Sequence, residues 1–107
     1  MLRVAAARGS APTWVYRFAW ASTKSGIALH CVDVPFFFDC LDERHVPGLT
    51  GPNPPQALAD AVHGAAVAFI RSGDPGWEPR AASGAARLFD VPDGMDADGY
   101  AGARPLV

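Results

Sequence analysis

The sequence predicts a small α/β fold with an incomplete β-sheet. Three observations indicate it: an aromatic and β-branched run at Thr13–Trp20, an amphipathic pattern at Asn53–Ser72, and a second β-prone run at Ala86–Val91. A strand, a helix and a strand in that order form part of a layered α/β architecture. Two strands alone leave bare edges, so the sheet is expected to need further strands from elsewhere.

The first predicted strand begins directly after Pro12 and carries apolar side chains on both faces. A strand of this kind is typical of a sheet that is covered on both sides. The alternation of the strand places four aromatic side chains on one face, at Trp14, Tyr16, Phe18 and Trp20.

The long helix is predicted over Asn53–Ser72, with Asn53 as its N-cap and Pro54 at the first helical position. Gly73 is expected to end it and Pro75 to prevent its continuation. Its apolar face is formed by residues spaced three to four apart, namely Leu58, Val62, Ala65 or Ala66, and Phe69.

Irregular segments connect these elements. The polar loop Ala21–Ile27 leads to His30, and the apolar stretch Val32–Phe38 is expected to be broken by Pro35. The charged segment Asp39–Gly51 is expected to be irregular.

The two ends of the sequence carry weaker signals. Leu2–Arg8 is predicted to be the last turns of a helix that ends at Gly9. Residues 92–107 are rich in Gly, Asp and Ala, and are expected to form a flexible tail of the single domain 1–107.

Composition excludes several classes of function. The formal net charge is −2 and no cluster of Lys and Arg occurs, so neither a nucleic acid nor an anionic membrane is an expected partner. The sequence contains no apolar run long enough for a transmembrane helix or a signal peptide, which favours a cytoplasmic location.

The two cysteines, Cys31 and Cys40, are predicted to be buried or half-buried free thiols in a reducing compartment. Together with His30 and His45 they offer zinc-ligand chemistry, but their spacing fits no common zinc motif. No metal and no other cofactor is therefore expected.

Three stretches carry a family resemblance. VYRFAW at Val15–Trp20, LHCVDVPFFFD at Leu29–Asp39, and Leu49–Trp77 with its FIRSGDPGW ending occur in the order and spacing of a known C-terminal region, and ARLFD at Ala86–Asp90 follows. Together they resemble the C-terminal segment of the type-B carboxylesterase and cholinesterase family, in particular the para-nitrobenzyl-esterase-like members. The resemblance implies the C-terminal portion of an α/β-hydrolase fold: strand, His loop, long helix and last strand.

The resemblance implies that His30 is the catalytic histidine of a Ser-Glu/Asp-His triad, acting as general base and then general acid. In the family the serine stands in a G-x-S-x-G elbow, which this sequence lacks, as it lacks the Gly-rich oxyanion loop. The nucleophile and the triad acid are therefore expected outside this sequence. By its neighbours alone, His30 also fits a structural histidine beside apolar residues.

The residues near His30 leave two further interpretations open. Asp33 lies three residues after His30, a spacing that fits a His–Asp dyad. In the family the triad acid comes earlier in the chain, so a structural or supporting role is expected for Asp33. Ser25 lies in the same loop as His30, without an elbow or an oxyanion hole to activate it. Cys31 stands where the family usually has Gly or Ala.

Two hypotheses of function follow. The first is a C-terminal fragment of a serine esterase that acts on small-molecule carboxylic esters, inactive and poorly folded alone, and completed by a separate N-terminal segment bearing the nucleophile. The alternative is a non-catalytic cholinesterase-like structural or interaction module, which predicts a stable, monodisperse protein. Folding competence in isolation distinguishes the two.

Overall fold

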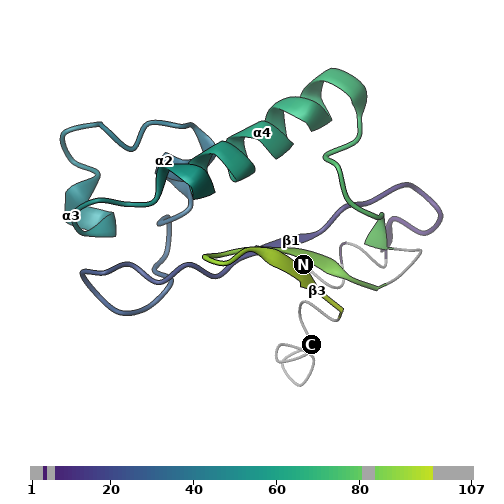
Figure 1. Ribbon diagram of the computed structural model, residues 1–107. Helices are drawn as coiled ribbons and strands as arrows, with labels where there is room; N and C mark the ends of the chain where they lie inside the picture. Colours follow the sequence, from purple (N-terminus) through teal and green to yellow (C-terminus); the bar gives the residue numbers. More distant parts are fainter. Residues whose placement is uncertain (1–3, 5–6, 81–83, 98–107) are drawn as a thin grey trace.

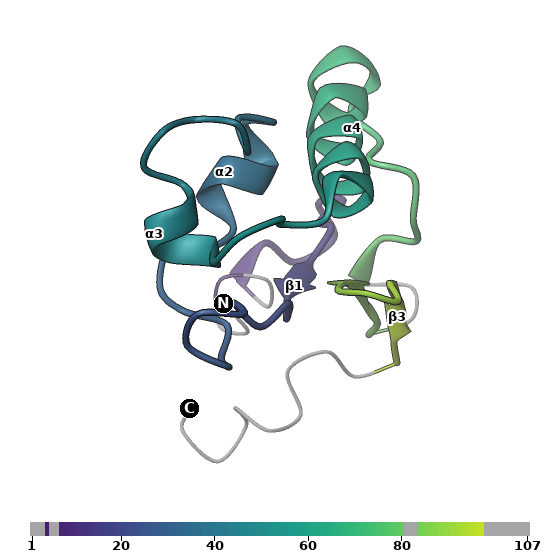
Figure 2. The ribbon, with the colours of Figure 1, turned by 60° about the vertical axis from the view of Figure 1, so that its left-hand side comes forward.

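The computed structural model describes residues 4, 7–80 and 84–97. These residues form two layers, with a small sheet on one side and the helices stacked against one of its faces (Figures 1 and 2). The elements, in chain order, are β1 (Tyr16–Phe18), α2 (Val34–Phe37), α3 (Pro47–Thr50), α4 (Gln56–Ser72), β2 (Ala86–Phe89) and β3 (Gly94–Asp96). The mixed α/β class is as the sequence predicts.

The sheet has the strand order β1-β2-β3. β1 and β2 pair in parallel, with Tyr16 opposite Arg87 and Phe18 opposite Phe89, so both predicted strands are present and adjacent. Both strands are shorter than the predicted runs Thr13–Trp20 and Ala86–Val91.

The third strand, β3, lies inside the segment expected to be a flexible tail. It pairs antiparallel with β2 and is held by side chains: Arg87 Nη1 donates to the Gly94 carbonyl at 2.8 Å, and Arg17 pairs with Asp96 at 3.2 Å. The short sequence Gly-Met-Asp has little β-propensity, so only these tertiary contacts identify the strand. Residues 98–107 lie outside the described residues.

The first helical residue of α4 is Gln56, two residues later than the predicted Pro54. Asn53 takes a left-handed conformation with φ 54° instead of capping the helix, and Pro55 precedes the first helical residue in an extended conformation. The two consecutive prolines explain the shift, because a residue before proline is driven away from the helical region. The end is as predicted: Gly73 has φ 76° and donates its N–H to the Phe69 carbonyl at 2.8 Å.

Two short helices occupy segments that the sequence predicts to be irregular. Pro35 does not break the stretch Val32–Phe38; it stands in the first turn of α2, where its missing N–H is not needed. Pro47 is the first residue of α3, inside the segment Asp39–Gly51, and its missing N–H is likewise not needed there. At the N-terminus, the Arg8 N–H donates to the Val4 carbonyl at 3.2 Å, while the remainder of Leu2–Arg8 lies mostly outside the described residues.

The core lies between α2, α4 and the sheet. Phe36 of α2 is fully buried, and its ring centroid is 5.2 Å from those of both Phe18 and Trp20. His63 of α4 donates from Nδ1 to the Phe37 carbonyl at 2.9 Å, which ties α4 to α2. The buried core residues are Trp20, Val32, Phe36, Leu58, Ala59, Val62 and Phe89.

Substitution of Gly51 by alanine is expected to destabilise the chain by about 2 kcal/mol or more. Gly51 has φ 79°, and an added Cβ would lie 2.1 Å from Thr23 Oγ1 and 3.0 Å from the Lys24 nitrogen. Urea denaturation measures the effect. Gly48→Ala is the matched control, since its Cβ meets no atom within 4 Å, and equal midpoints for the two variants would contradict the prediction.

Candidate functional site

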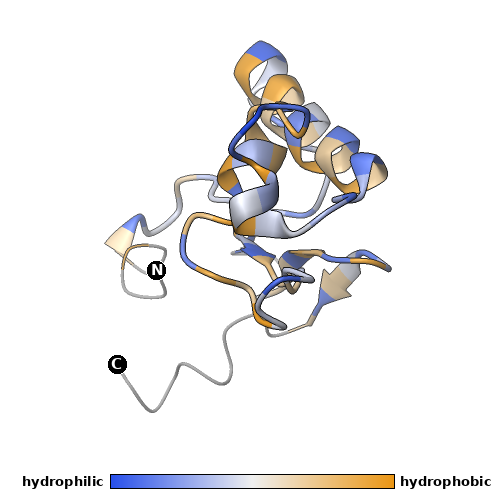
Figure 3. Cartoon of the chain, turned by 90° about the vertical axis from the view of Figure 1, so that its left-hand side faces the viewer, coloured by the Kyte–Doolittle hydropathy of each residue, from blue (hydrophilic) through white to orange (hydrophobic). Residues whose placement is uncertain are grey.

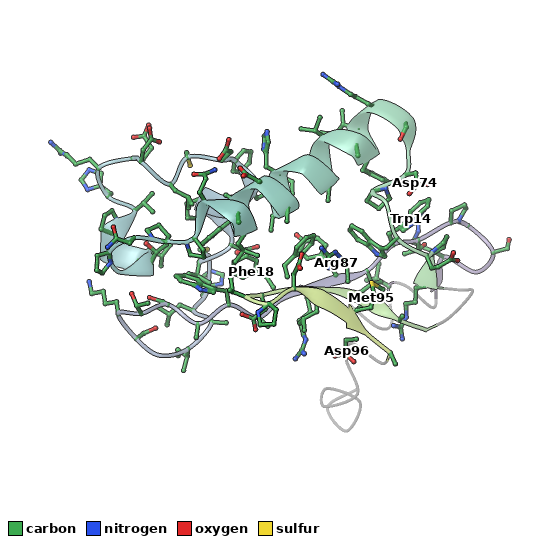
Figure 4. The ribbon with its side chains drawn as sticks, viewed as in Figure 1. Trp14, Phe18, Asp74, Arg87, Met95 and Asp96 are labelled. Atoms are coloured by element: carbon green, nitrogen blue, oxygen red, sulfur yellow. The ribbon has the colours of Figure 1, made fainter. Side chains whose placement is uncertain are left out.

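His30 lies on the surface beside β1. It is exposed and lines a concavity of about 420 Å³ whose walls are residues 14–18 and 28–33. Figure 4 shows Phe18 and Trp14, two of the wall residues, toward opposite ends of the β1 region. The concavity therefore runs along the strand, and His30 is accessible from it.

The loop that leads to His30 is anchored at both ends. Ser22 is fully buried. It donates from Oγ to the Leu49 carbonyl at 2.8 Å and from its backbone N–H to the Ile27 carbonyl at 3.0 Å. Val32, two residues after His30, is buried in the core. The exposed histidine therefore lies between two buried residues, Ser22 and Val32. The part that Ser22 plays in positioning this loop could not be predicted from its polar sequence neighbours.

The structure does not join His30 to its nearest candidate partners. Within residues 7–80, no hydrogen bond or ion pair links His30 to Asp33, and the Asp33 side chain makes no capping hydrogen bond to α2. Ser25 Oγ donates to the Ile27 carbonyl at 3.2 Å, inside its own turn, rather than to the imidazole. Neither a His–Asp dyad nor a Ser–His pair is formed by these residues.

Cys31 holds the chain in an unusual conformation directly after His30. Its φ is 65°, in the left-handed region that costs a residue with a Cβ about 1–2 kcal/mol. Glycine adopts this region without that cost. Cys31 and Cys40 are both free thiols, and Cys40 is partly buried as predicted. The prediction is wrong for Cys31, whose thiol is exposed.

Cys31→Gly is expected to raise the free energy of unfolding by about 0.5–1 kcal/mol, because relief of the left-handed strain exceeds the entropy lost by a flexible residue. Cys31→Ala retains the Cβ and is expected to leave stability nearly unchanged. Chemical denaturation of the two variants beside the native chain measures both effects. Equal shifts for Gly and Ala would mean that the backbone at Cys31 is not strained.

A metal site and a membrane span each place requirements on the side chains and helices of the described residues. Among residues 4, 7–80 and 84–97, no group of three or more His, Cys, Asp or Glu side chains is placed to hold a metal ion. His45 is exposed and lies beside Arg44, with 3.4 Å between Nε2 and Nη2. Within the same residues, every helix is too short or too polar to cross a membrane.

The fold is similar to that of a solved enzyme, the Geobacillus stearothermophilus carboxylesterase EST55. Its crystal structure at pH 6.2 matches 98% of this chain with a TM-score of 0.78 and 30% identity, and its structure at pH 6.8 matches with 0.75 and 28%. This chain resembles a quarter of a carboxylesterase. It covers 24% of the EST55 chain in both comparisons, which supports the expectation of an esterase fragment. No family model matches the sequence.

Proposed function

We propose that this chain is the histidine-bearing C-terminal part of a serine carboxylesterase of the type-B, α/β-hydrolase kind. His30 is proposed as the general base and acid of a Ser-Glu/Asp-His triad whose other members lie outside this sequence. The substrates of the complete enzyme are small-molecule carboxylic esters. The chain alone is proposed to be inactive.

The similarity to EST55 over 98% of this chain carries the proposal. The surroundings of His30 support it as well, since the imidazole is exposed, borders a concavity and follows a loop anchored by buried Ser22. An accessible imidazole on a fixed support is what proton transfer to and from a serine requires.

The proposed chemistry assigns His30 one task at each of two steps. The imidazole takes the serine proton as the hydroxyl attacks the ester carbonyl, and returns that proton to the leaving alcohol. An acid from outside this sequence would orient the ring, because Asp33 makes no hydrogen bond to it.

Fluorophosphonate labelling followed by intact mass tests the proposal, since this reagent traps activated serines. The isolated 107-residue chain is expected to form no adduct. A chimera in which this chain replaces the matched quarter of EST55 is expected to form one adduct and to hydrolyse esters. A folded chimera that does neither would favour a non-catalytic module, and an adduct on the isolated chain would refute the fragment hypothesis.

A further inference from the structure

The two halves of α4 are covered very differently. Leu58, Ala59 and Val62 in its first half are buried in the core, with exposures of 3%, 0% and 3%. In the second half Phe69 is 49% and Ile70 is 79% exposed. Figure 1 shows the cause: α4 rises away from the sheet toward its C-terminal end.

The divergence leaves an apolar groove of about 380 Å³, here called the wedge. One wall is formed by Ala65, Phe69 and Ile70 of α4, and the opposite wall by Trp14 and Tyr16. Figure 4 shows Trp14 beneath the C-terminal half of α4, and Figure 3 shows that apolar residues continue along this helix.

The wedge is preformed. Trp14 donates from Nε1 to the Trp77 carbonyl at 2.8 Å, and the Trp14 and Phe69 rings meet edge to face at 5.9 Å. The Trp14 ring is therefore fixed in place and contacts Phe69 of the opposite wall, while the groove beside these rings stays open. Such an apolar opening indicates an interaction surface.

A cation stands among the residues that line the wedge. Arg8 donates from Nε to Thr13 Oγ1 at 2.6 Å, and among the described residues no carboxylate forms an ion pair with it. A fixed guanidinium beside apolar walls favours an occupant with large apolar side chains and a carboxylate at one end.

We propose that the wedge is the docking site for an apolar polypeptide segment, carrying an Asp or Glu that pairs with Arg8, from the part of the esterase that this sequence lacks. The proposal rests on the proposed function, because the chain covers only 24% of EST55 and some three quarters of that enzyme has no counterpart here. A segment of that remainder is the occupant that matches the open helix face.

Cysteine labelling tests the docking site. Ile70→Cys in the isolated chain is expected to react rapidly with a maleimide, and the same substitution in the EST55 chimera to react about tenfold more slowly or less, because burial suppresses reaction. Arg71→Cys, which is exposed and outside the wedge, is the matched control and is expected to react alike in both proteins. Site-resolved mass spectrometry separates these sites from Cys31 and Cys40.

Equal reactivity of Ile70→Cys in the two proteins would overturn the proposal. The proposal would also be overturned if sedimentation showed that the isolated chain forms dimers in which Ile70→Cys is protected, because the wedge would then bind a second copy of the chain. Ester hydrolysis by the chimera tests the proposed function independently of the docking site. Protection with activity that does not depend on His30 refutes only the catalytic assignment, and exposure with His30-dependent activity refutes only the docking site.

A dye-binding measurement on the isolated chain does not depend on the chimera folding. Anilinonaphthalene sulfonate, an apolar anion, is expected to fluoresce on the native chain and to lose at least about half of that signal in the Phe69→Glu, Ile70→Glu double variant, which places charge on one wall. Unchanged fluorescence in the double variant would show that the wedge is not an open apolar site.

Discussion

Replacement of His30 by alanine in the EST55 chimera is expected to lower kcat for ester hydrolysis by about 10⁴- to 10⁶-fold, the range of losses seen when a single triad member is removed. The expected cause is loss of the proton acceptor for the serine. KM is expected to change little, because the proposed task of the exposed imidazole is proton transfer and not binding of the ground-state ester. Initial rates with a chromogenic ester measure both constants.

Two controls separate chemistry from folding in that experiment. His45→Ala removes an exposed histidine beside Arg44 and is expected to leave the rate unchanged. Far-UV circular dichroism of His30→Ala is expected to match that of the parent chimera, since His30 is exposed. A rate loss of less than about tenfold would remove His30 from the catalytic role.

Replacement of Phe36 by alanine is expected to cost the chain about 3–5 kcal/mol, the usual range for loss of a buried phenylalanine ring. Phe36 is fully buried and contacts the rings of Phe18 and Trp20, so its removal opens a cavity between α2 and the sheet. Such a loss is a large share of the stability of a domain of this size. The urea transition of the variant is expected to be shifted far down or absent.

Phe38→Ala is the matched control, with the same change of side chain at a position that is 65% exposed. Its expected cost is about 1 kcal/mol at most, arising from the edge contact with Phe37. Comparable losses for the two variants would mean that the core does not centre on Phe36.

Parts of the candidate site could be predicted and parts could not. The loop that leads to His30 follows from the polar run after an aromatic strand, and the structure places His30 on the surface after that loop. The role of Ser22 was not visible, because its hydrogen bond to Leu49 joins residues 27 apart. The wedge was not visible either, since the spacing of Phe69 predicts an apolar face but not what covers it.

The sequence by itself determined the features that depend on local chemistry. Gly73 and Pro75 ended α4 where the left-handed glycine allows the chain to turn, and the two β-prone runs became the parallel pair β1 and β2. Hydrophobic periodicity and the residues at helix ends act within a few positions of the sequence, so their effects can be predicted without knowledge of the fold.

Only the tertiary structure decided the remaining features. β3 exists because Arg87 and Arg17 bind its backbone and its Asp96 across the sheet, and the left-handed Cys31 is imposed by the chain path between the loop and the buried Val32. The separation of α4 from the sheet at Phe69 likewise depends on how whole elements pack. These are contacts between residues distant in sequence, whose energies no local pattern encodes.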